Sequence, residues 1–291
     1  MSELYDLFHR NFPFCVREES VVRTLLDSAD LIAEYRSGHL IGAAALEKNN
    51  LLMLCVDRDY RMQGIGSRLL TAAEQNVKDA GFSHITIGAG EHYIMPGVPS
   101  PVPVVNEALL PDRIYPGLEN HTDFFRKRGY LHAWDCSCFD MRGEFNNLPS
   151  VVPRTDGITF RFADADDIPA VCKCVQNAHE SFVKYYRNPA TYQRPKRRVL
   201  IAEQGTEVVG TLMVCLETEG KGLGSVGCTA VHRDWQGRKI ATDLVLHGTH
   251  ALKNSGMDRA FLGYTYTGLD KLYGTAGYQI CCYYMMAKKD L

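Results

Sequence analysis

The stretch from Leu51 to Gly81, LLMLCVDRDYRMQGIGSRLLTAAEQNVKDAG, decides how the rest of the chain is understood. Its apolar start, residues 51–56, predicts a strand, and the amphipathic run that ends at Gly81 predicts a helix. Between them lies a glycine loop, residues 61–66. Such a loop directs several backbone N–H groups at one point, and the positive end of the helix dipole adds to their attraction for an anion. The stretch therefore predicts a site for a phosphate or pyrophosphate.

The pattern of this loop separates it from two other phosphate-binding loops. A Walker loop ends in Gly-Lys-Ser or Gly-Lys-Thr, and this loop has no such ending. A Rossmann fingerprint needs Gly-x-Gly-x-x-Gly, whereas this loop reads Arg-x-x-Gly-x-Gly. A nucleotide fold of either kind is therefore not indicated.

The same pattern occurs a second time in the chain. Residues 56–60, VDRDY, correspond to residues 231–235, VHRDW. With the same offset, further apolar and glycine positions correspond: Ile65 with Ile240, Leu69 with Leu244, Gly81 with Gly256 and Gly88 with Gly263. The repeat has two copies, and each copy is too long to be a solenoid unit. It therefore predicts a duplicated domain.

The Arg-x-x-Gly-x-Gly loop, set between its strand and helix, resembles the acetyl-CoA loop of the GNAT superfamily of N-acetyltransferases. Each half of the chain shows this resemblance, and the two halves together make up nearly the whole chain. It implies a mixed α/β (α+β) fold of two tandem GNAT domains, each a mostly antiparallel twisted sheet with a splayed central strand pair and flanking helices. We expect an N-terminal domain at residues 1–145, a linker at 146–157 and a C-terminal domain at 158–291.

The two domains are expected to differ at their start. The second half begins with residues 158–168, which predict a strand and then an aspartate-capped helix; this looks like the usual beginning of a GNAT domain. The first half has no equivalent of this strand. We therefore expect the sheet of the first domain either to be one strand short or to be completed by another segment, because an exposed edge invites pairing.

The resemblance implies acetyl-CoA as the cosubstrate and places it at the first loop. The residues expected to hold it are the end of the preceding strand, the loop with the first helical turn, and two later positions: Leu54, Cys55, Val56, Arg61, Met62, Gln63, Gly64, Ile65, Gly66, Ser67, Phe125 and Arg128. In the second loop Lys239 stands where Gly64 stands in the first. Its side chain would impair phosphate binding and strain a positive φ, or it could reach a phosphate directly.

Candidate catalytic residues lie in different halves. The tyrosine that usually serves the family as an acid falls on Tyr273, whose alternative role is to pack the last helix on the sheet. The first half has Phe125 at this place, which has no proton to give. Glu91, or its neighbour His92, is a candidate base in the first half, and a solvated loop charge is the alternative. The sequence leaves open which half performs the transfer.

The implied activity is that of an acyltransferase, an acetyl-CoA-dependent N-acetyltransferase in which a primary amine attacks the thioester directly. The acceptor amine would belong to a small molecule, such as an amino sugar or an antibiotic, or to a peptide. Residues 96–99, Pro-Gly-Val-Pro, resemble a loop of tandem GNAT proteins, some of them joined to sugar-cleaving enzymes, which favours an amino sugar. The alternative is a non-catalytic acetyl-CoA-binding sensor or scaffold, which would release no thiol with any amine.

Composition bears on partners and location. A formal net charge of −2 gives no general attraction to nucleic acid or membrane, and no apolar run is long enough to cross a bilayer. The first residues lack the pattern of a secretory leader, so we expect a cytoplasmic protein. We also expect its two domains to pack on each other. The cysteine spacings do not match zinc sites, and His247 and His250, although suitably spaced, have no identifiable third ligand. No metal is expected.

Overall fold

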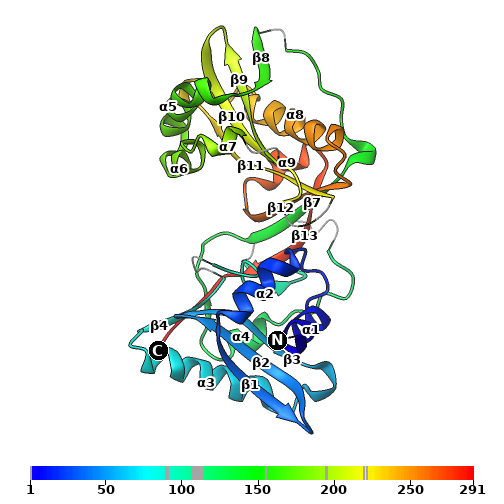
Figure 1. Ribbon diagram of the computed structural model, residues 1–291, viewed down its shortest axis with the longest axis vertical. Coiled ribbons are helices and arrows are strands. Elements are labelled where there is room, and N and C mark those ends of the chain that lie inside the picture. Colours follow the sequence, from blue (N-terminus) through cyan, green and yellow to red (C-terminus); the bar gives the residue numbers. More distant parts are fainter. Residues whose placement is uncertain are drawn as a thin grey trace. The chain divides into compact units, whose positions relative to one another are not determined.

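The computed structural model describes residues 2–88, 92–105, 114–154, 156–193, 196–218, 220 and 222–291. It divides into two compact units (Figure 1). Unit 1 consists of Met1–Phe139 together with Cys281–Leu291, and unit 2 consists of Asp140–Ile280. Two strands, β7 (Cys138–Glu144) and β13 (Tyr278–Met285), contribute residues to both units.

Unit 1 has a sheet with helices on both of its faces. Its elements are α1 (Ser2–Asn11), α2 (Glu19–Asp27), β1 (Asp30–Arg36), β2 (His39–Glu47), β3 (Asn50–Val56), α3 (Ile65–Asp79), β4 (His84–Ile87), β5 (Val98–Ser100), α4 (Thr122–Arg126), β6 (Leu131–His132) and β14 (Ala287–Asp290). Both α1 and α3 contact β2 and β3. Strand β2 is buried at seven successive residues, which requires cover on both faces.

The sheet of unit 1 has the order β1-β2-β3-β4-β14-β6. All of its strand pairs are antiparallel except β3 with β4, which are parallel. These two pair only where β3 begins, with Asn50 opposite Thr86 and Leu51 opposite Ile87. The rest of β3, as far as Val56, pairs with β2 alone. The predicted splayed central pair is therefore present in unit 1.

Glycine allows helix α3 to lie close against this sheet. The buried face of α3 consists of Ile65, Leu69, Leu70, Ala73 and Val77. A Cβ atom at Gly42 of β2 would lie only 3.0 Å from Cγ2 of Ile65, so a larger residue would push the helix away. The same close packing recurs in unit 2, where a Cβ atom at Gly210 would lie 3.0 Å from Cγ2 of Ile240. This close packing sets the first turn of α3 beside the end of β3.

The last strand of the chain belongs to the first unit. Strand β14 lies between β4 and β6 and pairs with both. Nζ of Lys289 in β14 donates to both carboxylate oxygens of Glu74 in α3, each at 2.9 Å. The structure thus differs from a linear division that gives residues 158–291 to the second domain. The physical reason is that β6 has only two residues, whereas β14 pairs with all four residues of β4.

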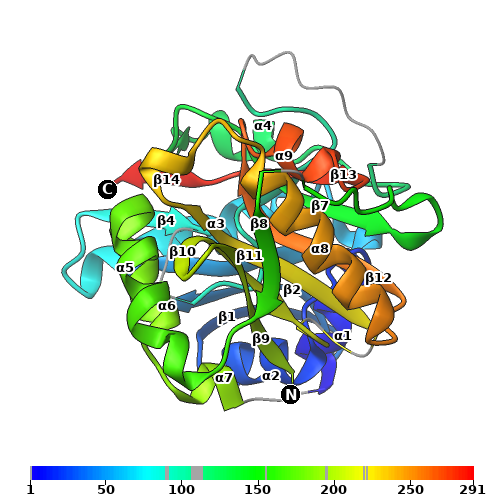
Figure 2. The same ribbon diagram turned by 90° about the horizontal axis from the view of Figure 1, so that it is seen from above.

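Unit 2 repeats the architecture with one more strand at its start. Its elements are β8 (Ile158–Phe162), α5 (Ile168–His179), α6 (Val183–Tyr186), α7 (Ala190–Gln193), β9 (Arg197–Gln204), β10 (Glu207–Cys215), β11 (Leu223–Val231), α8 (Ile240–Asn254), β12 (Arg259–Tyr266) and α9 (Asp270–Gly274). Helices α5 and α8 cover opposite faces of the sheet (Figure 2). Strand β8 lies at the edge beside β9, whereas in the described part of unit 1 nothing pairs with the outer side of β1. Unit 1 therefore lacks the usual first strand, as the sequence predicts.

The segment expected as a linker is packed on unit 2. His250 of α8 lies with Nε2 at 2.7 Å from the carbonyl of Pro149. Just before this segment, the carbonyl of Phe145 accepts from Lys253 at 3.3 Å. Arg154 forms an ion pair with Asp243 of the same helix. The ring of His247 instead stacks on Phe160, with centroids 4.3 Å apart. These contacts give the two spaced histidines separate packing partners.

The described residues show neither a membrane-spanning helix nor a cluster of metal-ligating side chains. No helix among them combines the length and apolar character needed to cross a membrane. They also contain no group of three or more His, Cys, Asp or Glu side chains arranged to hold a metal ion.

Candidate functional site

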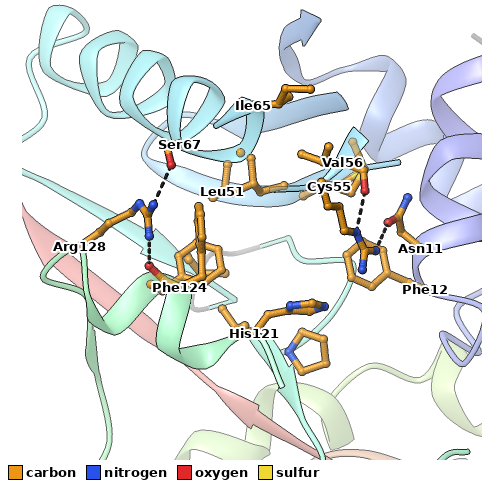
Figure 3. A pocket seen from close by; sticks show the side chains of 18 of the residues that line it. Asn11, Phe12, Leu51, Cys55, Val56, Ile65, Ser67, His121, Phe124 and Arg128 are labelled. Carbon is orange, nitrogen blue, oxygen red and sulfur yellow. Dashed lines mark hydrogen bonds between the residues drawn. The ribbon is translucent and has the colours of Figure 1, made fainter. Parts of the chain in front are cut away.

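A pocket of about 490 Å³ lies in unit 1 where β3 and β4 separate (Figure 3). One wall is β3 itself, and a second is the glycine loop with the first turn of α3. The opposite wall contains Phe124, Phe125 and Arg128, and His121 and Phe12 also face the cavity. Every residue that the sequence places at the cosubstrate lines this pocket except Gln63, whose Oε1 accepts from Nη1 of Arg36 at 3.3 Å.

The loop presents backbone donors to the pocket. Gly64 has a φ of +78° and directly precedes α3, and the first helical bond of α3 runs from the N–H of Arg68 to the carbonyl of Gly64 at 3.1 Å. The N–H groups of Ile65, Gly66 and Ser67 come before this bond and have no partner within the helix. They are therefore available to an anion such as a pyrophosphate.

Arg128 adds a cation beside these donors. Its Nη2 donates to Oγ of Ser67 at 2.7 Å, and its Nη1 donates to the carbonyl of Phe124 at 2.7 Å. The guanidinium also lies 3.8 Å from the centroid of the Phe124 ring. Figure 3 shows these bonds holding the side chain at the start of α3. The donor set, with its backbone N–H groups, one fixed guanidinium and an apolar channel along β3, fits the phosphates and the arm of a CoA thioester.

Arg61 acts within the protein rather than as a free cation. It donates through Nε to the carbonyl of Val56 at 3.1 Å, through Nη2 to Oδ1 of Asn11 at 2.7 Å and through Nη1 to Oε2 of Glu119 at 2.6 Å. Its counterpart in unit 2, Gln236, donates to the carbonyl of Val231 at 3.1 Å. The first residue of each loop thus caps the strand before it, and Arg61 also joins that strand to α1 and to the segment before α4.

Each loop has two residues in the left-handed backbone region, and in each loop one of the two is not glycine. Met62 has a φ of +62° and Gly64 of +78° in the first loop, whereas Gly237 has +77° and Lys239 has +61° in the second. A non-glycine residue in this region costs on the order of 1–3 kcal/mol. The turn therefore needs the positive φ that the sequence argument anticipated, and Lys239 adopts it under strain.

Tyr273 lies in the core of unit 2. Its side chain is 4% exposed, its ring packs on that of Tyr278 with centroids 5.8 Å apart, and its hydroxyl lies 3.4 Å from Oγ1 of Thr229. Burial raises the pKa of this hydroxyl, partly offset by the hydrogen bond with Thr229. Nearby, the hydroxyl of Tyr186 donates to the carbonyl of Cys228 in β11 at 2.6 Å. The hydroxyls of Tyr186 and Tyr273 therefore contact polar groups of β11, namely the carbonyl of Cys228 and the hydroxyl of Thr229.

The corresponding position in unit 1 holds an aromatic wall. Phe125 is 6% exposed and packs edge-on against both Phe124 and Tyr130, with centroids 5.1 Å and 5.5 Å apart. The hydroxyl of Tyr130 points away to Oε1 of Glu74 at 3.0 Å, and burial together with that carboxylate raises its pKa. The described part of this wall offers no hydroxyl in place of Phe125.

The candidate bases from the sequence are placed differently. Glu91 lies outside the described residues. His92 is described, and its Nδ1 lies 2.7 Å from Oε1 of Glu47 while its carbonyl accepts from Asn50 at 2.9 Å. It is not among the described residues that line the pocket.

Sequence reasoning missed His121 and its partner Glu119. His121 lies immediately before α4 and lines the pocket, with Nε2 at 3.1 Å from Oε2 of Glu119. Burial acts to raise the pKa of Glu119, but hydrogen bonding and charge from Arg61, together with His121 and Arg58, lower it overall. Burial lowers the pKa of His121, and Arg61 adds to this while Glu119 opposes it. The only sequence signal was a polar residue one helical turn before Phe125.

The chain has a duplicated α/β domain with a splayed strand pair and an anion-binding loop, and two family models identify the family of this fold. The model described as acetyltransferase (GNAT) domain matches residues 9–93, and the model described as acetyltransferase (GNAT) family matches residues 167–278. Together they span more than half of the chain. The chain belongs to the GNAT family and is a tandem acetyltransferase of this class.

Solved structures share the fold over the whole chain. The glucosamine N-acetyltransferase region of a fungal multi-domain GH3 beta-N-acetylglucosaminidase is 18% identical, with a TM-score of 0.70, and the alignment covers 99% of this chain and 36% of that one. A GCN5-related N-acetyltransferase from Sphaerobacter thermophilus is 17% identical, with a TM-score of 0.68 and coverage of 99% and 91%. A tandem GNAT protein from the clavulanic acid biosynthesis pathway is 15% identical, with a TM-score of 0.59 and coverage of 90% and 83%.

These identities establish the shared fold. The chain spans about a third of the length of the fungal protein. No curated protein sequence matches the chain significantly.

Proposed function

We propose that this protein is an acetyl-CoA-dependent N-acetyltransferase whose unit 1 binds the cosubstrate and performs the transfer to a primary amine. The observation that carries this proposal is the pocket between β3, the glycine loop and α4, which brings Leu54, Gly64 and Arg128 to one cavity. The pyrophosphate would lie on the N–H groups at the start of α3, beside Arg128. The pantetheine arm would lie along the half of β3 that does not pair with β4.

The transfer in unit 1 does not require a tyrosine. The thiolate of CoA is a tolerable leaving group, and water can protonate it. A backbone N–H of β3 is suited to stabilise the oxyanion of the tetrahedral intermediate. Unit 2, where Tyr273 is buried and Lys239 is strained, then serves as a structural partner.

An amino sugar is the first acceptor to test. Support comes from the Pro-Gly-Val-Pro segment, in which Val98 and Pro99 line the pocket, and from the fold shared with a protein described as a glucosamine N-acetyltransferase region. The assay measures thiol release from acetyl-CoA with glucosamine and with a panel of other primary amines.

The cosubstrate assignment has its own experiment. Calorimetry should give one acetyl-CoA bound per chain, and Gly64→Glu should abolish binding because it adds a side chain and a negative charge at the phosphates. Circular dichroism and thermal unfolding verify that this variant folds. Unchanged affinity in folded Gly64→Glu would remove the assignment to unit 1.

A second function, that of a non-catalytic acetyl-CoA sensor, is favoured by Phe125, which stands at the acid position and has no proton to give. Binding of acetyl-CoA without thiol release across the amine panel would support this function over the enzyme.

A further inference from the structure

A second cavity in unit 1, of about 430 Å³, adjoins the acetyl-CoA pocket. The two cavities share Asn11, Phe12, Pro99 and His121 in their walls. The wall of the second cavity includes Phe14 and Tyr115, whose rings stack with centroids 5.6 Å apart. This volume lies within the range of about 300–1,000 Å³ typical of small-molecule sites. The proposed cosubstrate site leaves this cavity without a role.

His121 stands where the two cavities meet, and its side chain is 41% exposed. Among the described residues, the carboxylate of Glu119 is the hydrogen-bond partner of its ring, at 3.1 Å from Nε2. A carboxylate only accepts, so a neutral ring that keeps this contact has its proton on Nε2 and a lone pair on Nδ1. Figure 3 shows the imidazole between the walls formed by Phe124 and Phe12.

Burial favours a neutral imidazole at His121, and the charge of Glu119 opposes it. Glu119 also contacts Nη1 of Arg61 at 2.6 Å and Nη2 of Arg58 at 3.9 Å, so its negative charge is shared with two guanidinium groups. The pKa of His121 accordingly lies below its usual value, with burial as the main cause. Arg58 and Glu119 both line the second cavity, and Arg61 contacts Glu119. Two guanidinium groups against one carboxylate disfavour an ammonium ion there, so an amine that enters the cavity is bound better after losing its proton.

We propose that the second cavity holds the acceptor, a primary amine on a compact scaffold of about the size of a sugar ring, and that His121 is the base that takes the proton of this amine. Glu119 is a positioning residue that holds the imidazole with Nδ1 free. The inference rests on the proposed function, because it needs acetyl-CoA in the adjoining pocket.

The step balances without a further reagent. The lone pair of the amine nitrogen forms a bond to the thioester carbonyl carbon, and the C–S bond breaks so that sulfur leaves with its electron pair. The proton that the nitrogen loses passes to Nδ1 of His121. The thiolate of CoA takes up one proton and becomes the thiol. The products are the N-acetyl amine and CoA.

The test compares His121→Ala and His121→Asn with the wild type, using glucosamine, tyramine, spermidine and glycinamide as amine probes. Since general bases contribute about 10²–10⁴-fold, we expect kcat with the best probe to fall at least 100-fold in both variants. The affinity for acetyl-CoA, measured by calorimetry, should change less than twofold. Imidazole added to the buffer should restore part of the rate of His121→Ala, which a structural defect would not allow.

Two further variants examine Glu119 and the cavity wall. Glu119→Gln removes a negative charge that raises the pKa of His121, so the acidic limb of the pH profile of kcat/KM should move to lower pH. Phe14→Ala should raise the KM of the amine at least fivefold and leave that of acetyl-CoA unchanged.

The outcomes separate this inference from the proposed function. Full activity of both His121 variants would overturn the role of His121 and leave the transferase intact. A tenfold loss of acetyl-CoA affinity at unchanged kcat would make His121 a cosubstrate contact and also overturn it. Thiol release with none of the probes, while acetyl-CoA still binds, would overturn the enzymatic function and the inference together.

Discussion

Nη2 of Arg128 donates a hydrogen bond of 2.7 Å to Oγ of Ser67, which places a fixed guanidinium at the first turn of α3. The two residues are far apart in the sequence, and α4 and α3 bring them to the same end of the pocket. A cation at this point reinforces the backbone N–H groups that face an anion.

We therefore expect Arg128→Met to weaken acetyl-CoA binding about tenfold, since a charge-assisted hydrogen bond contributes about 1.5–3 kcal/mol. Calorimetry measures the dissociation constant. Arg126→Met is the matched control, because Arg126 donates to the carbonyl of Val104 and does not line the pocket. Equal effects of the two substitutions would contradict the role of Arg128.

Lys239→Gly should raise the free energy of unfolding by about 1 kcal/mol, because it relieves the left-handed strain at this position. Gly64→Ala should lower it by a similar amount, about 1 kcal/mol, since alanine tolerates a positive φ poorly. Denaturant titration measures both changes. A destabilised Lys239→Gly would show that the lysine side chain makes a contact worth more than the strain.

The second loop should not gain a cosubstrate from this change. We expect calorimetry of Lys239→Gly to give the same stoichiometry as the wild type, because Tyr186 still holds the carbonyl of Cys228 in the splayed strand of unit 2. A second binding event in this variant would show that Lys239 by itself prevents acetyl-CoA from binding to unit 2.

Tyr273→Phe should change the rate of thiol release less than twofold if unit 1 performs the transfer. The substitution removes only a hydroxyl whose nearest partner, Oγ1 of Thr229, is 3.4 Å away. Thermal unfolding should show a small effect on stability. A tenfold loss of turnover, equivalent to about 1.4 kcal/mol of barrier, would instead assign the chemistry to unit 2.

Lys289→Met should lower the free energy of unfolding by about 1–3 kcal/mol, because it leaves the mostly buried carboxylate of Glu74 without the cation that bonds both its oxygens. Lys288→Met is the control, since Lys288 is half-exposed and pairs with the exposed Asp290. Its expected effect is below about 0.5 kcal/mol. Comparable losses in both variants would argue against a specific role for Lys289 in holding β14.

The local elements of the site could be predicted because each is determined by a run of consecutive residues. The apolar run of β3, the glycines of the loop and the periodic face of α3 specify strand, turn and helix without help from distant parts of the chain. Because the same pattern occurs in both halves, the repeat predicted the same fold for both units. The positions that line the pocket followed from the same register, with Gln63 as the exception.

The partners of side chains could not be predicted in this way. Arg61 was expected at the cosubstrate, yet its guanidinium is taken up by Val56, Asn11 and Glu119. His121 carried no motif, and its importance comes from two cavities that meet beside it. Such contacts depend on where separate elements come to lie, and a one-dimensional pattern does not contain this information.

By itself, the sequence determined that this protein is a tandem GNAT acetyltransferase with its better-preserved anion loop in the first half. The tertiary structure decided that β14 completes the first sheet, that Tyr273 is enclosed in unit 2 and that His121 faces the pocket of unit 1. The physical reason is that local hydrogen bonding and periodicity are encoded over a few residues. Strand pairing and burial, in contrast, are settled by competition among segments far apart in the chain.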